Sequence, residues 1–105
     1  GVGLEEDADK ARALAMGALE HYARLPNYRN NWLRLGFTEE EIDSRSDRLL
    51  DALFAVGGPE KVADRVRAHL DAGADHVCLQ VIAGGQGAGF DVLRPHWRRL
   101  AEALL

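Results

Sequence analysis

The most constraining feature of this chain is a short apolar run at residues 76–82, HVCLQVI, followed by four glycines within residues 84–89. The run is too short for a helix, and its interior holds one polar residue, Gln80. This pattern predicts a β-strand buried on both faces, as in a parallel sheet. A lone buried strand leaves backbone N–H and C=O groups unpaired, at about 1–3 kcal/mol each. We therefore expect partner strands from outside this sequence or from a second copy of it.

The rest of the chain carries helical signals. Apolar residues recur at helical spacing, Thr38 and Glu41 form a capping box, and glycines or prolines separate the segments. A helix, a strand, a glycine loop and a helix fill the last part, which is the order of one unit of a parallel α/β protein. We predict an α/β fold, mostly helical, with one buried parallel strand at 76–82 and helices at about 4–25, 28–35, 38–43, 46–56, 59–72 and 92–104.

Composition narrows the classes of partner. The chain has 105 residues, 47% of them hydrophobic, which suits one small domain over residues 1–105. Its net charge of −4 argues against binding to nucleic acid or to an anionic membrane surface. The single cysteine permits no internal disulfide, and we find neither a membrane-spanning run nor a signal peptide. We expect a cytoplasmic protein that binds small molecules or other proteins.

Three segments together resemble a known family. They are residues 25–37 (LPNYRNNWLRLGF), residues 46–53 (SDRLLDAL) and residues 59–81, which include the turn AGADHV. They are similar to the C-terminal part of the bacterial luciferase-like monooxygenases, in particular the group of probable F420-dependent oxidoreductases. The first segment is the most specific, whereas the third recurs in many barrels.

The resemblance implies a fold and an activity. Members of the family are (β/α)₈ TIM-type barrels of about 250 residues, of which this chain would supply the last third. It also implies a parent enzyme that uses coenzyme F420 or FMN for hydride transfer to, or monooxygenation of, a small organic substrate. The earlier strands, where most cofactor contacts are expected, have no counterpart here. We therefore expect this segment alone to be inactive, and the parent to be a homo-oligomer.

Four residues are candidates for cofactor binding: Gln80, Gly84, Gly85 and Gly87. Loops after the last strands of such barrels often bind phosphate through backbone N–H groups, and glycine lets the backbone approach closely. Gln80 is the polar residue near the carboxyl end of the predicted strand, where barrel active sites gather. Two alternatives stay open: the glycines form an ordinary loop, or Gln80 satisfies a buried backbone group.

Other polar residues have weaker functional patterns. His76 and Cys78 fall on one strand face, but a metal site needs more ligands than these two, so we predict no metal and a buried, hydrophobic role for Cys78. Residues 28–34 are rich in aromatic and arginine side chains, which suits either coenzyme binding or packing at an interface. Packing is the favoured interpretation. The sequence identifies no catalytic residue.

An alternative function belongs to another class. The chain would be a small helical interaction module without catalysis, in which the lone strand pairs across a homodimer. The open outer edges of such a two-stranded pairing argue against this alternative.

Overall fold

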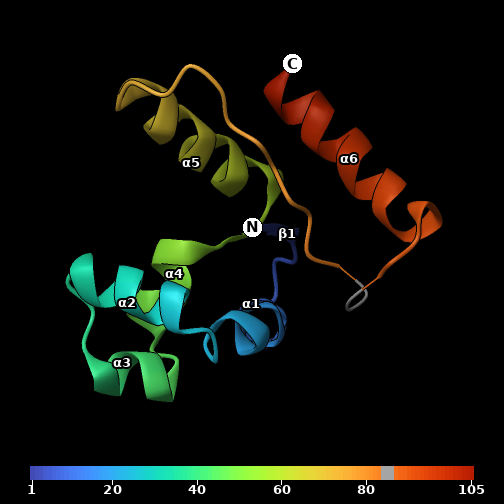
Figure 1. The fold of residues 1–105 in the computed structure, drawn as a ribbon. Helices are drawn as coiled ribbons and strands as arrows, with labels where there is room; N and C mark the ends of the chain where they lie inside the picture. Colours follow the sequence, from blue (N-terminus) through green and yellow to red (C-terminus); the bar gives the residue numbers. More distant parts are fainter. Residues whose placement is uncertain (84–86) are drawn as a thin grey trace.

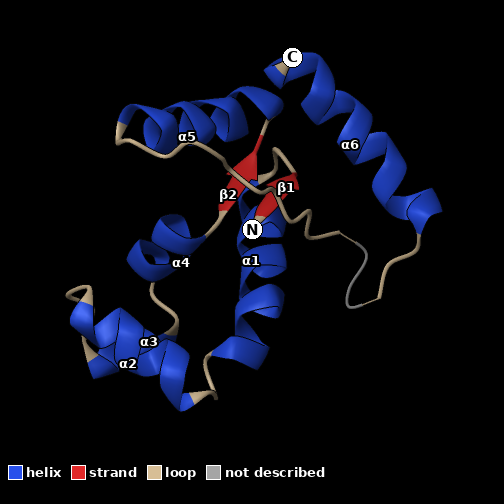
Figure 2. Cartoon of the chain, turned by 45° about the horizontal axis from the view of Figure 1, so that its top comes forward, coloured by secondary structure: helices blue, strands red, loops and turns tan. Residues whose placement is uncertain are grey.

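A computed structural model describes residues 1–83 and 87–105. Two short parallel strands, β1 (Val2–Leu4) and β2 (Ala55–Gly57), lie side by side at its centre, with Val2 opposite Ala55 and Leu4 opposite Gly57 (Figure 2). The crossover between them carries α1 (Ala8–Tyr22), α2 (Pro26–Arg34), α3 (Glu39–Ser44) and α4 (Asp47–Leu53). After β2 come α5 (Pro59–Asp71) and α6 (Phe90–Leu104) (Figure 1). The predicted α/β class, mostly helical with parallel strands, is confirmed.

The predicted strand at 76–82 is wrong for most of its length. Only Val81 forms a bridge, parallel to Val2. The N–H of Val2 donates to the Gln80 carbonyl and the Val2 carbonyl accepts from the N–H of Ile82, both at 2.8 Å. The partner of residues 80–82 therefore comes from this same chain, and the expectation of a partner from outside this sequence or from a second copy is wrong for them. Because β1 is only three residues long, it pairs with the end of the segment and leaves His76, Cys78 and Gln80 exposed.

The sheet has its first strand in the middle. β1 pairs with β2 along one edge and with Val81 along the other. Val2 and Ala55 pack in the same cluster as Val62 of α5 and Leu100 of α6. On the opposite face, a Cβ at Gly3 would lie 2.9 Å from Leu14 of α1. Helices therefore cover both faces of this sheet. In a barrel wall, by contrast, the helices form an outer ring, and the strands are arranged in their order along the chain.

Local capping sets the limits of the helices. α1 begins at Ala8 and not near Leu4, because the Asp7 side chain accepts from the N–H of Lys10 and Val2–Leu4 belongs to the sheet. The predicted capping box of Thr38 and Glu41 is confirmed at the start of α3. The helix predicted for 46–56 ends at Leu53, since the next residues form β2.

Two glycines turn the chain where helices end. Gly36 has φ of 100° and Gly73 has φ of 106°, a left-handed conformation that side chains other than glycine rarely adopt. Gly36 follows α2 and Gly73 follows α5, in keeping with the expectation that glycines separate the helical segments. Gly36 also directs the chain from α2 toward α3.

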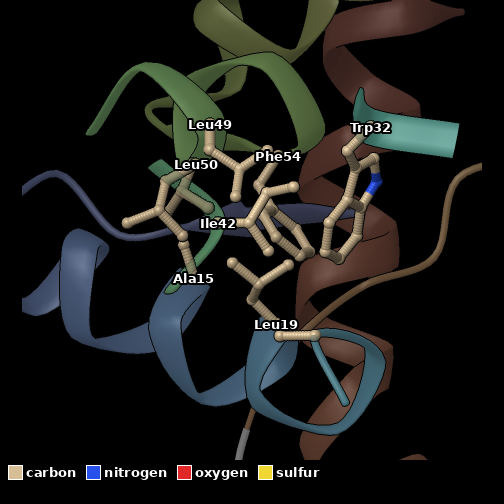
Figure 3. Close-up of a cluster of buried hydrophobic side chains, with 9 residues drawn as sticks. Ala15, Leu19, Trp32, Ile42, Leu49, Leu50 and Phe54 are labelled. Atoms are coloured by element: carbon tan, nitrogen blue, oxygen red, sulfur yellow. The ribbon is translucent and has the colours of Figure 1, made fainter. Parts of the chain in front are cut away.

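The larger hydrophobic core lies among the first four helices (Figure 3). Leu19, Ile42 and Leu49 are at most 1% exposed, and the Trp32 side chain is 3% exposed. Phe54 and Val56 join this core from the sheet side. α2 and α3 are too short to be stable alone. This core therefore stabilises them by packing them against α1 and the sheet. No helix in the described part of the chain is long and apolar enough to cross a membrane.

Candidate functional site

An open groove of about 1280 Å³ runs beside the sheet. Its walls come from α1, from α2, from residues 78–83 and from α6. Its lining is mostly apolar and includes several aromatic side chains, and two amide side chains, Asn31 and Gln80, add hydrogen-bonding groups. A mostly apolar cleft with a few convergent polar groups is the common form of a small-molecule site. The aromatic residues lining the groove are Tyr22, Tyr28, Trp32, Phe54 and Trp97.

A short aromatic ladder forms one wall of the groove. The rings of Tyr22 and Tyr28 have centroids 4.8 Å apart, and those of Tyr28 and Trp32 are 6.1 Å apart. Tyr28 and Trp32 are neighbours on α2 because they are four residues apart in a helix. Pro26 starts α2 immediately after α1, which brings the α2 rings beside Tyr22. The buried Trp32 ring anchors this wall in the core.

Two of the four predicted cofactor residues lie at the groove. Gln80 lines it with an exposed side chain, while the bond from Val2 to its carbonyl holds its backbone against β1. Gly87 also lines it, with φ of 77°. Gly84 and Gly85 lie outside the described residues. The structure therefore brings Gln80 and Gly87 together with the α2 aromatics, which are about fifty residues away in the sequence.

The arginine and aromatic residues of 28–34 divide between two roles. Tyr28, Asn31 and Trp32 line the groove. Arg29 instead forms ion pairs with Glu39 and with Asp43, the latter at 3.0 Å, and so links α2 to α3. The favoured packing interpretation holds for Arg29 and for the buried Trp32. The exposed residues Tyr28 and Asn31 face the groove instead.

Cys78 does not have the buried position that the sequence predicts. Cys78 is exposed and lines the groove, because the predicted strand that contains it pairs with β1 only at Val81. Within residues 1–83 and 87–105, no group of three or more His, Cys, Asp or Glu side chains is placed to hold a metal ion.

A second, charged hollow of about 540 Å³ lies at the carboxyl ends of β1 and β2. Its lining includes Arg12 and Lys61. The Arg12 Nε lies 2.6 Å from an Asp47 carboxylate oxygen, so this cation is already paired. Carboxylates are the more numerous charges, which makes the hollow acidic. The acidic residues at its wall are Glu5, Glu6, Asp9, Asp47 and Asp51.

Sequence reasoning did not identify the α1 side of the groove. Leu14, Gly17 and Tyr22 line it from one helix face. A glycine inside a helical pattern, such as Gly17, is one available signal, since it costs stability and often has a packing or binding reason. A Cβ at Gly17 would have none of the described atoms within 4 Å.

Comparison of the chain with family models, with curated proteins and with solved structures finds no match.

Proposed function

We propose that this chain forms one wall of a cofactor site in a flavin- or F420-dependent oxidoreductase of the luciferase-like kind. One observation carries the proposal. The segment with the most specific resemblance, residues 25–37, supplies Tyr28, Asn31 and Trp32 to the same groove that Gln80 and Gly87 line. These residues were singled out separately in the sequence, and only the fold brings them together.

The residue types suit a flat tricyclic ring. Tyr22 and Tyr28 offer aromatic faces and edges for stacking, and the buried Trp32 supports the Tyr28 ring. The Asn31 and Gln80 amides can both donate and accept hydrogen bonds at a polar ring edge. The bound cofactor would supply the hydride or oxygen chemistry. The contribution of this chain is binding and orientation, with Gln80 held by the backbone bond to Val2.

The groove offers little for proton transfer. Over the described residues, no carboxylate, imidazole, lysine or arginine side chain lines it. General acid or base catalysis depends most often on such groups. An acid or base for the parent's reaction would then come from elsewhere in the parent.

The proposed barrel origin rests on the resemblance and has a structural requirement. In a barrel, consecutive strands are neighbours, so β2 would stay beside β1 and the strand that precedes β1 would take the edge that Val81 occupies here. A cysteine pair at Val2 and Val81, which are opposite in the bridge, tests this requirement. Crosslinking is expected in the 105-residue chain. In the proposed parent it is expected to be lost, because the preceding barrel strand would displace residue 81 from β1.

Binding of the cofactor is the direct test of function. The 105-residue chain is titrated with FMN and with F420 by calorimetry, alongside Gly17→Leu and the matched control Gly17→Ala. Gly17 lines the groove and faces open space, so the leucine is expected to block binding and the alanine to preserve it. Failure of both cofactors to bind the unmodified chain, or equal binding to Gly17→Leu, would overturn the proposal.

The interaction-module alternative loses its main support. It required a lone strand that pairs across a homodimer, and residues 80–82 pair with Val2 of the same chain. A homo-oligomeric parent in the cytoplasm, acting on a small organic substrate, remains part of our proposal.

A further inference from the structure

We infer that the groove holds the uncharged ring of its ligand and that any phosphate or other anionic tail lies outside it. The inference rests on the proposed function and deepens it. The ligand class that the groove recognises is then an uncharged planar heterocycle, and riboflavin is a suitable probe for it. FMN differs from riboflavin only by its phosphate, so the two compounds separate ring recognition from anion recognition.

The lining of the groove is electrically neutral in its side chains. Along residues 1–83 and 87–105, its polar side chains are the amides of Asn31 and Gln80, the tyrosine hydroxyls and the Cys78 thiol. A phosphate dianion loses hydration when it enters a cleft, and the loss is large unless a cation or several hydrogen-bond donors replace the water.

Two arginines that contact the helices of the groove wall, Arg29 and Arg45, are engaged in ion pairs. Arg29, on the same helix as Tyr28 and Trp32, is paired with Glu39 and Asp43. Arg45 lies 2.8 Å from a Glu20 carboxylate oxygen. Moving either guanidinium to a phosphate would break an ion pair between two helices. The gain from a new pair would thus be offset by the loss of an existing one.

The second hollow does not suit the tail either. Five carboxylates line it against Arg12 and Lys61, and Arg12 already contacts Asp47. A negatively charged ligand would be repelled there, because like charges in a partly enclosed site interact more strongly than in open water. In the part of the chain that the structure describes, neither the neutral groove nor the acidic hollow favours an anion.

The test compares riboflavin with FMN on the whole 105-residue chain by calorimetry. We expect the two dissociation constants to agree within about threefold, and FMN binding to be nearly constant between about 0.05 and 0.5 M salt, since surface charge attraction would be screened over that range. FMN binding at least about tenfold tighter than riboflavin, a difference of 1.4 kcal/mol, would overturn the inference while the proposed function stood. Binding of neither compound would overturn the inference, and the proposed function would fall with it if F420 also failed to bind.

A matched pair of variants adds a gain-of-binding test. Ala13→Lys places a cation at the groove, and Ala13→Gln places an uncharged side chain of similar length there, because Ala13 is an exposed residue of the groove wall. We expect only Ala13→Lys to favour FMN over riboflavin, by about threefold or more at low salt. An equal preference in both variants would contradict a groove that lacks its own anion-binding group.

Discussion

Val2 and Val81 form the bridge that attaches the last third of the chain to the sheet. Val2 uses both its N–H and its carbonyl for this bridge, with Gln80 and Ile82 as the partners at 2.8 Å. Val2 itself is only 5% exposed, and its side chain packs with Ala55 and Val62 on the α5 and α6 side of the sheet. The position of Gln80 at the groove therefore depends on a residue at the other end of the sequence.

Removal of one bridge bond is the first prediction. Ile82→Pro eliminates the N–H that donates to Val2 and leaves the Val2 carbonyl without that partner, which typically costs about 1–3 kcal/mol. The control Ile82→Val keeps the N–H and loses one methylene, at about 0.5–1.5 kcal/mol. Urea unfolding midpoints measure both. Equal destabilisation by the two variants would show that the bridge bond contributes nothing.

The buried side chain of Ile42 gives the second prediction. Ile42 is fully buried in the core that joins α1 to α4, so Ile42→Ala is expected to lower the free energy of unfolding by about 2–5 kcal/mol. Leu35 is 63% exposed, and Leu35→Ala is expected to change that free energy by no more than about 0.5 kcal/mol. Thermal or urea unfolding measures both variants. Similar losses of stability in the two would contradict the described core.

Gly17 provides the third prediction, in the opposite direction. It lies within α1, and none of the described atoms would be within 4 Å of an added Cβ. Gly17→Ala is therefore expected to stabilise the chain by about 0.5–1 kcal/mol, because glycine is entropically unfavourable inside a helix. A lower unfolding midpoint in this variant would mean that Gly17 is in contact with another part of the protein.

The capping box at α3 gives the fourth prediction, a pH dependence. The pKa of Glu41 lies below its ordinary value of 4.5, first because its carboxylate accepts from the Thr38 N–H and then because Arg48 lies beside it. The unfolded chain thus binds the proton more readily than the folded chain. The stabilisation by Glu41 is complete above the unfolded pKa and is lost as the pH falls through the lower, folded pKa.

Glu41→Gln is expected to remove this acid-dependent part of the stability. Unfolding midpoints measured from neutral pH to below 4.5 would then fall less steeply for the variant than for the unmodified chain. Glu40→Gln, one position earlier on the exposed side of α3, serves as the control and is expected to keep the steep fall. The reverse ranking of the two variants would be inconsistent with the Thr38 and Arg48 contacts.

Part of the candidate site was predictable. Gln80, Gly87 and the aromatic residues of 28–34 have recognisable local patterns, and they do line the groove. The α1 side of the groove was not predictable, because no local pattern indicates that Gly17 and Gln80 line the same groove. The exposure of Cys78 was not predictable either, because it depends on how much of residues 76–82 pairs with β1.

The sequence by itself determined the helices and most of their ends, because caps, prolines and left-handed glycines act over a few residues. Thr38 with Glu41 and Gly36 after α2 are examples. Only the tertiary structure decided which residues are strands and how they pair. Val2–Leu4 and Ala55–Gly57 are too short to show a periodic pattern, and each is stabilised by backbone partners about fifty residues away. The sheet order, and with it the groove, depends on those distant contacts.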